Sequence, residues 1–218
     1  MSHIHKDHAI SLDHILKALN GPKPGVDSHM KMASIRSDRF KQYYQPSDNA
    51  HDAAVGLLLV PKGDYWSVLF MKRASHESDK HSGQISFPGG RKERTDRSLL
   101  DCALREIEEE IGLERKYIKL LGELTPLYVF ASNHMVYTYV GYTEALDQLV
   151  PNEEVAEIIL GPIDDILRHG VHKIDMEIEG TILKNVPYYN LNGEVLWGAT
   201  AMIFTELLDI IKDIGNQR

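Results

Sequence analysis

Three glutamates in one short segment are the residues best suited to chemistry in this sequence. Glu106, Glu109 and Glu110 lie within the segment Arg105–Leu113. On a helix, with about 100° between residues, their carboxylates share roughly a third of the circumference, and we expect all three to project away from the side that packs. Like charges at this spacing destabilise a helix by about 0.2–0.5 kcal/mol per pair, and a divalent cation reverses that effect. We therefore expect Glu106 and Glu110 to bind a hard cation such as Mg²⁺.

The neighbouring residues favour a site over the alternative, which is a solvated acidic helix face. The pair Gly89-Gly90 precedes the helix and lets the backbone approach a ligand closely. Arg105 adds a fixed cation beside the acids. An apolar stripe is expected to hold the helix against the core. Its members are Leu100, Ala103, Leu104, Ile107 and Ile111.

The segment Gly90–Leu113 resembles the motif of the Nudix hydrolases. That motif runs Gly, five residues, Glu, seven residues, and then Arg-Glu-apolar-x-Glu-Glu-x-Gly-apolar. Arg105–Leu113 matches it completely, whereas Asp96 replaces the first Glu and eight residues separate Asp96 from Arg105. The extra residue resembles the branch of the family that cleaves coenzyme A, and so does the run Gly83–Gly90, which reads Gly-Gln-Ile-Ser-Phe-Pro-Gly-Gly.

This resemblance implies a reaction and a set of roles. The reaction is metal-dependent hydrolysis of a diphosphate bond, with coenzyme A or an acyl derivative as substrate and Mg²⁺ or Mn²⁺ as cofactor. The resemblance further implies that the Gly90 carbonyl is a metal ligand and that Arg105 fixes the carboxylates. Glu109 is expected to orient the attacking water as a base, or to be an additional ligand.

Two other functions stay open on the sequence. One is hydrolysis of ADP-ribose, dinucleoside polyphosphates or NAD(H). The other is a non-catalytic Nudix-fold binding module, although such modules typically lose the acids that are retained here.

Recognition of the 3′-phosphate of coenzyme A is a separate question. The coenzyme A branch usually carries Leu-Arg where this chain has Ser78-Asp79, and threonine where it has Met71. We expect a nearby cation to substitute for the missing arginine. The candidate substrate-binding residues are Arg73, Lys80 and His81, together with Gly89 and Gly90 of the turn.

Two further segments resemble the coenzyme A branch. Pro151–Glu157 is acidic and is positioned to offer another carboxylate to a metal or a water; the alternative is a solvated loop. Val195–Ala201 resembles a C-terminal signature of the branch; the alternative is a buried strand end followed by a helix start.

Composition limits the classes of protein to which this chain can belong. The chain has 218 residues, of which 43% are hydrophobic, so one sizeable core is expected. A net charge of −8 argues against non-specific nucleic-acid binding. A single cysteine, Cys102, excludes an internal disulfide and is expected to be inert. With neither a signal-like segment nor a membrane span, we expect a cytoplasmic protein whose partner is a small nucleotide. A homodimer stays open on the sequence.

Periodicity and breakers predict the elements that position these residues. Ser98 is expected to cap the acidic helix and Gly112 to end it. The expected strands are Ala53–Val60, Trp66–Met71, Gln84–Phe87, Ile118–Leu127, Met135–Tyr142 and Ile158–Leu160, with a hairpin at Tyr188–Val195 that turns at Asn192-Gly193. The other expected helices are Pro162–Arg168 and Ala199–Ile214. This order indicates an α/β or α+β fold, and the resemblance implies a Nudix-type α/β/α sandwich with a mixed sheet.

The first fifty residues differ in composition from the rest. We predict an N-terminal helical arm over residues 1–50 and the hydrolase domain over residues 51–218. Helices are expected at Ile10–Leu19 and Ile35–Tyr44, with the arm packed on the domain or on a partner subunit. Several histidines lie near the start, but their spacing fits no standard zinc site. They are His3, His5, His8 and His14.

Overall fold

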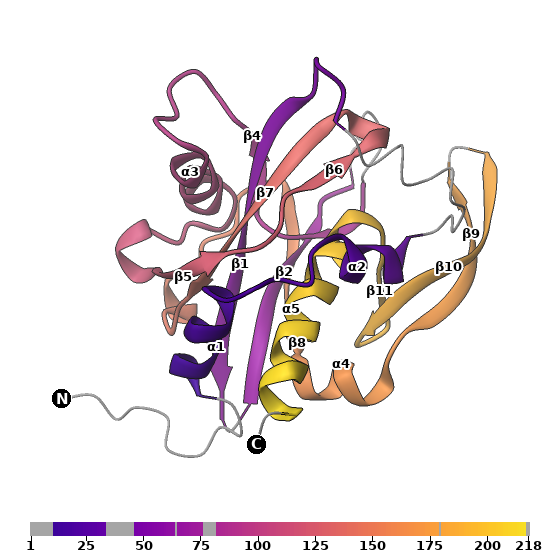
Figure 1. The fold of residues 1–218 in the computed structure, drawn as a ribbon. Coiled ribbons are helices and arrows are strands. Elements are labelled where there is room, and N and C mark those ends of the chain that lie inside the picture. Colours follow the sequence, from indigo (N-terminus) through magenta and orange to yellow (C-terminus); the bar gives the residue numbers. More distant parts are fainter. Residues whose placement is uncertain (1–10, 34–45, 64, 76–81, 179, 217–218) are drawn as a thin grey trace.

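In the part of the chain that the structure describes, a mixed eight-stranded sheet carries helices on both faces (Figure 1). This computed structural model describes residues 11–33, 46–63, 65–75, 82–178 and 180–216. The strands of the sheet are β1 (His51–Lys62), β2 (Tyr65–Arg73), β3 (Ile85–Ser86), β4 (Gly89–Arg91), β5 (Lys119–Glu123), β6 (Leu127–Val129), β7 (His134–Tyr142) and β8 (Val155–Pro162). A smaller sheet contains β9 (His172–Ile178), β10 (Thr181–Leu191) and β11 (Glu194–Leu196).

The helices are α1 (Leu12–Leu19), α2 (Val26–His29), α3 (Leu99–Ile111), α4 (Ile163–His169) and α5 (Gly198–Asn216). Short 3₁₀ turns are η1 (Met30–Met32), η3 (Arg115–Tyr117), η4 (Phe130–Ser132) and η5 (Leu146–Gln148). None of the helices in the described ranges is long and apolar enough to cross a membrane.

Strand β1 lies at the centre of the large sheet. It pairs in parallel with β7 and antiparallel with β2 and β4. Alternate side chains of β1 enter different cores: Leu57 and Leu59 pack with residues of α5, whereas Leu58 and Val60 pack with residues of α3. The apolar run Ala53–Val60 is therefore buried on both faces, as expected for a central strand.

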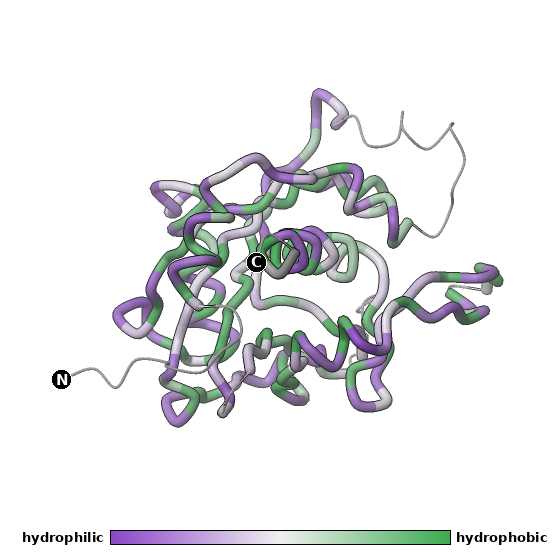
Figure 2. Tube along the Cα trace, turned by 60° about the horizontal axis from the view of Figure 1, so that its bottom comes forward, coloured by the Kyte–Doolittle hydropathy of each residue, from purple (hydrophilic) through white to green (hydrophobic). Residues whose placement is uncertain are grey.

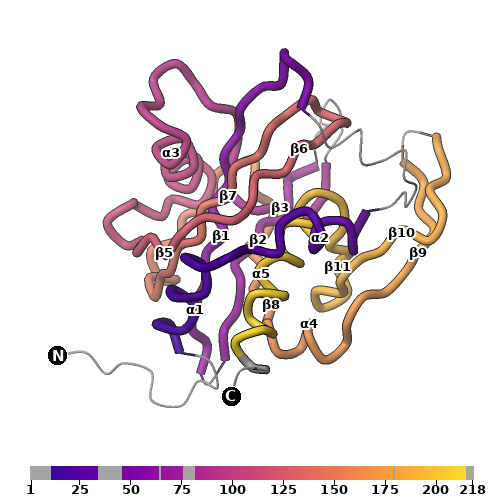
Figure 3. The backbone as a smooth tube through the Cα atoms, in the orientation of Figure 1, coloured from indigo at the N-terminus to yellow at the C-terminus, as the bar shows by residue number. Residues whose placement is uncertain are grey.

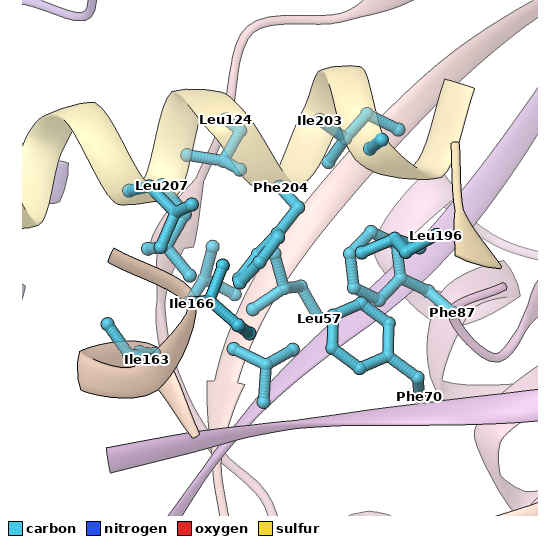
Figure 4. Packing of buried hydrophobic residues seen from close by; sticks show 14 of the residues in the cluster. Leu57, Phe70, Phe87, Leu124, Ile163, Ile166, Leu196, Ile203, Phe204 and Leu207 are labelled. Carbon is cyan, nitrogen blue, oxygen red and sulfur yellow. The ribbon is translucent and has the colours of Figure 1, made fainter. Parts of the chain in front are cut away.

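The larger core lies between the sheet and α5 (Figure 4). Phe70 of β2 stacks on Phe87 at 5.1 Å between ring centroids and meets Phe204 of α5 edge-on at 5.3 Å. Leu196, at the end of β11, belongs to the same cluster. This packing fixes the chain just before the Gly89-Gly90 turn against the start of α5.

The N-terminal helices pack on α5 as well. Ile15 and Leu19 of α1 and Met32 of η1 are almost completely buried in the same core as the residues of α5. Figure 1 shows α1 and α2 alongside α5, on the sheet face opposite α3. The N-terminal segment thus contacts the body of its own chain, while the division into residues 1–50 and 51–218 stays a prediction.

A buried carboxylate joins the N-terminal segment to α5. Glu206 is fully buried and accepts hydrogen bonds from the Gly25 and Thr125 amides and the Thr125 hydroxyl. His29, also fully buried, places Nε2 3.0 Å from the same carboxylate. We call Glu206, His29, Gly25 and Thr125 the Glu206 network. It connects α2, the β5–β6 loop and α5.

The strands β9 and β10 form a ribbon that extends from the body (Figures 2 and 3). Its base is fixed by Tyr189, whose hydroxyl lies 3.0 Å from the hydroxyl of Thr205 in α5. The β10–β11 turn has positive φ at Asn192 and Gly193, as the sequence predicted for a tight hairpin. Strand β9 was not predicted, because its side chains are largely exposed and alternate weakly.

Most predicted elements are present, and one prediction is wrong. A single strand over Ile118–Leu127 does not form: β5 ends at Glu123 and β6 begins at Leu127, with Pro126 between them. Proline cannot donate a ladder hydrogen bond, so the strand breaks there. The helix predicted at Ile35–Tyr44 lies outside the described residues.

Candidate active site

The acidic helix α3 begins and ends where the sequence predicted. The Ser98 hydroxyl accepts a hydrogen bond from the Asp101 amide at 3.0 Å, and Gly112 adopts φ 70° at the C-terminal end. Ile107 and Ile111 are buried against the sheet. The helix is therefore held at both ends and along one side, which fixes the positions of its carboxylates.

Glu110 is buried, which corrects the expectation that all three glutamates project outward. It is only 4% exposed, and its Oε2 accepts a hydrogen bond of 2.8 Å from the Gly89 amide. Burial raises the pKa of Glu110 to about 8, and the nearby charge of Glu106 adds to the effect. The Gly89 hydrogen bond opposes this rise only in part. Because burial disfavours the ionised form of a carboxylate, a cation beside Glu110 would stabilise that form.

The glycine turn lies directly against these carboxylates. A Cβ atom on Gly90 would lie 2.4 Å from Oε1 of Glu106, and one on Gly89 would lie 2.5 Å from the Ala54 carbonyl oxygen. At Gly89 the added atom would meet backbone, so this position requires glycine, whereas at Gly90 it would meet only the end of the Glu106 side chain and displace it. The turn therefore brings backbone groups and carboxylates together. Burial also raises the pKa of Glu106, against the opposing charge of Arg105.

Arg105 joins the other acids into one network. Its Nη1 lies 2.9 Å from Glu106 and 2.8 Å from Glu109. On its other side, Asp96 accepts two hydrogen bonds from the guanidinium, at 2.9 and 3.0 Å. These bonds hold the pKa of the buried Asp96 carboxyl below its usual range. The guanidinium thus connects Asp96 to the two more exposed glutamates.

The sequence predicts no role for Asp96 beyond its place at the first glutamate of the motif. The signal was the spacing itself, because an acid at the position of the first motif glutamate calls for a cationic partner. The structure identifies that partner as Arg105, and the Glu93 amide donates a further hydrogen bond to Asp96 at 2.7 Å.

Cys102 has no nucleophilic role in this arrangement. It is fully buried, and its Sγ lies 3.6 Å from the Gly90 carbonyl oxygen, to which it donates. Burial raises the pKa of the thiol to about 11, so it stays protonated at neutral pH. The expectation of an inert cysteine agrees with this environment.

Residues from two other segments approach Glu110. Burial is the main cause of the raised pKa of Glu110. The charge of Arg73 lowers this pKa and the charge of Glu154 raises it further, so both side chains lie near this carboxylate. The acidic loop is fixed there, because the Asn152 amide donates to the Glu110 carbonyl and the Ala74 amide to the Glu154 carbonyl. The other two predicted substrate-binding residues, Lys80 and His81, lie outside the described residues.

The donors at this site fit a hard divalent cation. They are carboxylates and a backbone carbonyl, all oxygen ligands, and among the described residues no cation bonds to the buried Glu110 carboxylate. Within the described residues, no group of three or more His, Cys, Asp or Glu side chains is arranged to hold a metal by itself. Mg²⁺ commonly keeps several waters and takes substrate phosphates as ligands, so one or two protein carboxylates are enough to bind it.

A methyl group on Gly90 tests this geometry. In Gly90→Ala the new Cβ displaces the Glu106 carboxylate. Misplacement by about 1 Å is expected to reduce kcat/KM roughly a hundredfold. The melting temperature should change little, because only the flexible end of the Glu106 side chain has to move. Steady-state kinetics and thermal melting measure the two effects.

Gly21→Ala is the matched control for this variant. Its Cβ would lie 3.3 Å from the Ala18 carbonyl of α1, away from α3. Activity in Gly90→Ala equal to that of Gly21→Ala would show that the Glu106 position does not matter for turnover.

Comparison with known proteins points to one family. The NUDIX domain model matches residues 50–178. An uncharacterized Nudix hydrolase, NudL, of Pectobacterium atrosepticum is 35% identical over 147 residues, covering 66% of this chain and 76% of that protein. A NudL of Photorhabdus laumondii is 33% identical over 168 residues, covering 76% of this chain and 88% of the relative.

Solved structures share the fold. A Nudix hydrolase from M. smegmatis, RenU, superposes with a TM-score of 0.50 at 16% identity, covering 80% of this chain and 96% of that one. A mutT/nudix family protein from Listeria innocua gives the same TM-score and identity over 78% and 97% of the two chains. From the domain match and these relatives, the chain belongs to the Nudix hydrolase family.

Proposed function

We propose that this Nudix hydrolase cleaves the diphosphate bond of coenzyme A or an acyl-coenzyme A. The products are 3′,5′-ADP and phosphopantetheine or its acyl derivative. Hydrolysis of a nucleoside diphosphate derivative follows from the family. The proposal concerns which derivative this chain prefers.

The contact between β3 and β11 carries the proposal. Gly83–Gly90 and Val195–Ala201, the two segments that resemble the coenzyme A branch, are more than a hundred residues apart in the chain. Yet β3 contacts β11, and Phe87 packs in the same cluster as Leu196 (Figure 4). Lys72 of β2 forms an ion pair with Glu194 at 2.6 Å beside them. Their meeting next to the glycine turn supports a shared role in substrate binding.

The proposed metal ligands are Glu106, Glu110 and the Gly90 carbonyl. Nudix hydrolases generally use divalent cations, and Mg²⁺ or Mn²⁺ bound here would neutralise phosphate charge and acidify a water. The chain's own contribution is to fix the ligands before substrate binds. Gly89 orients Glu110 through its amide, and Arg105 orients Glu106.

Glu109 is the proposed base. Its side chain is 55% exposed, so water reaches it, and Arg105 holds one carboxylate oxygen at 2.8 Å. In the reaction a water oxygen bonds to one phosphorus, the bond from that phosphorus to the bridging oxygen breaks, and the water proton passes to the base. Glu154 is the second candidate for this step, since it also lies near Glu110.

A substrate panel tests the proposal. Coenzyme A, acetyl-coenzyme A, ADP-ribose, a dinucleoside tetraphosphate and NADH are compared by kcat/KM with Mg²⁺ and with Mn²⁺. Coenzyme A or its acetyl form is expected to have the highest value, with 3′,5′-ADP as product. The sequence difference at Ser78-Asp79 favours the other nucleotides, so cleavage of these alone would replace the proposal.

A further inference from the structure

Three nitrogen-bearing side chains gather at the ends of β1, β4 and β7. His51 opens β1 and His134 opens β7; they are directly paired in the parallel register, with ring centroids 5.7 Å apart. Arg91 closes β4, and its Nη2 lies 3.1 Å from Nδ1 of His51. We call Arg91, His51 and His134 the basic corner. None of these residues belongs to the carboxylate site described above.

The basic corner lies beside that site but on the other face of the sheet. Arg91 follows Gly90 in the chain, and its carbonyl oxygen accepts a hydrogen bond from Arg105 at 3.3 Å. The Arg91 side chain lies on the same sheet face as that of Ala53, its partner in β1. A Cβ atom added to Gly90 would lie on the opposite face, against Glu106. The corner is thus one residue from the proposed metal ligand and directed away from the carboxylates. A group bound there is a different group from the diphosphate.

The hydrogen bond within the corner leaves donors available. A guanidinium can only donate, so Nδ1 of His51 is the acceptor and its Nε2 carries the proton as a further donor. Among the described residues, no carboxylate lies within ion-pair distance of Arg91, whereas Arg97, Arg115 and Arg168 each have one. Arg91 and His51 are also exposed. On a chain of net charge −8, such a cluster of donors is suited to a small anion.

We propose that the basic corner binds the phosphate monoester on the ribose of the substrate. This inference rests on the proposed hydrolysis of coenzyme A and names the residues that select its 3′-phosphate. A phosphate monoester offers three acceptor oxygens, which matches the N–H donors that one guanidinium and two imidazoles can supply. The corner would then replace the arginine that the coenzyme A branch carries where this chain has Asp79.

The first test is the ratio of kcat/KM for coenzyme A to that for 3′-dephospho-coenzyme A. In Arg91→Ala this ratio is expected to fall about ten- to a hundredfold, because one charge-assisted contact is lost. Arg91→Lys should retain part of the ratio. Lys92→Ala, which removes the same charge one residue further on, should retain all of it. An equal loss on both substrates in Arg91→Ala would overturn the inference.

Binding measured without turnover separates this inference from the proposed function. In chelator, wild type should bind 3′,5′-ADP at least about tenfold more tightly than 5′-AMP by calorimetry, and Arg91→Ala should bind the two alike. If this holds but coenzyme A is not cleaved, the proposed substrate fails and the basic corner stands. If coenzyme A is cleaved and Arg91→Ala keeps the preference for 3′,5′-ADP, the basic corner is overturned. Thermal melting confirms that each variant is folded.

Discussion

Replacing Glu110 with glutamine is expected to reduce kcat at least about a hundredfold while leaving the fold intact. Loss of a residue that merely supports a metal ligand typically costs 10–100-fold, and Glu110 is proposed to be a ligand itself. The fold is expected to survive, because the glutamine carbonyl can still accept the Gly89 hydrogen bond at the same place. Steady-state rates with Mg²⁺ and Mn²⁺, and rates in chelator, measure the effect.

The stability of the metal-free protein gives an independent check on the same residue. The pKa of Glu110 in the folded chain is about 8, above its ordinary value of 4.5. Its contribution to stability is therefore present below about pH 4.5 and is lost as the pH rises through 8. In chelator at pH 9, Glu110→Gln should melt at a higher temperature than wild type, and the difference should shrink towards pH 5.

Two results would contradict the placement of the site at Glu110. One is a variant that keeps near wild-type turnover. The other is a variant that melts well below wild type in chelator at pH 9, which would make Glu110 a structural residue. Glu108→Gln is the matched control, because Glu108 lies on the same helix and interacts with Arg115 instead of the glycine turn.

Replacing Glu206 with alanine is expected to lower the free energy of unfolding by about 3–5 kcal/mol. The change leaves the His29 ring and the amides of Gly25 and Thr125 buried without their acceptor. Removing one partner of a buried network typically costs this much. For a chain of this size the melting temperature should fall by roughly 10 °C. Chemical and thermal unfolding measure both quantities.

An exposed ion pair next to the Glu206 network is the control. Lys31 is 55% exposed and lies 2.7 Å from Asp209 of α5. Lys31→Ala should cost no more than about 1 kcal/mol. If Glu206→Ala costs as little as Lys31→Ala, the N-terminal segment is not held by the Glu206 network. Turnover per folded molecule should stay near the wild-type value in both variants, since the network lies on the sheet face opposite α3.

The sequence by itself determined the elements whose signals are local. A serine before an apolar stripe and a glycine after it fix the ends of α3, because capping involves residues only a few positions apart. Continuous apolar runs fixed β1 and β2, since such runs bury both faces of a strand. The acids of α3 and the Gly89-Gly90 turn were recognised for the same reason, as their spacing in the chain is the signal. Strand β9 carried no such pattern and was missed.

The tertiary structure decided everything that depends on which segments meet. Glu110 is buried because α3 lies against β4, and helical periodicity alone placed it on the exposed side. Arg105 bridges Asp96 and the glutamates across a loop whose path no local rule predicts. The basic corner needs the parallel register that sets His51 beside His134. Pairing between distant strands depends on the whole packed sheet, so the environment of each site residue emerged only when the chain was folded.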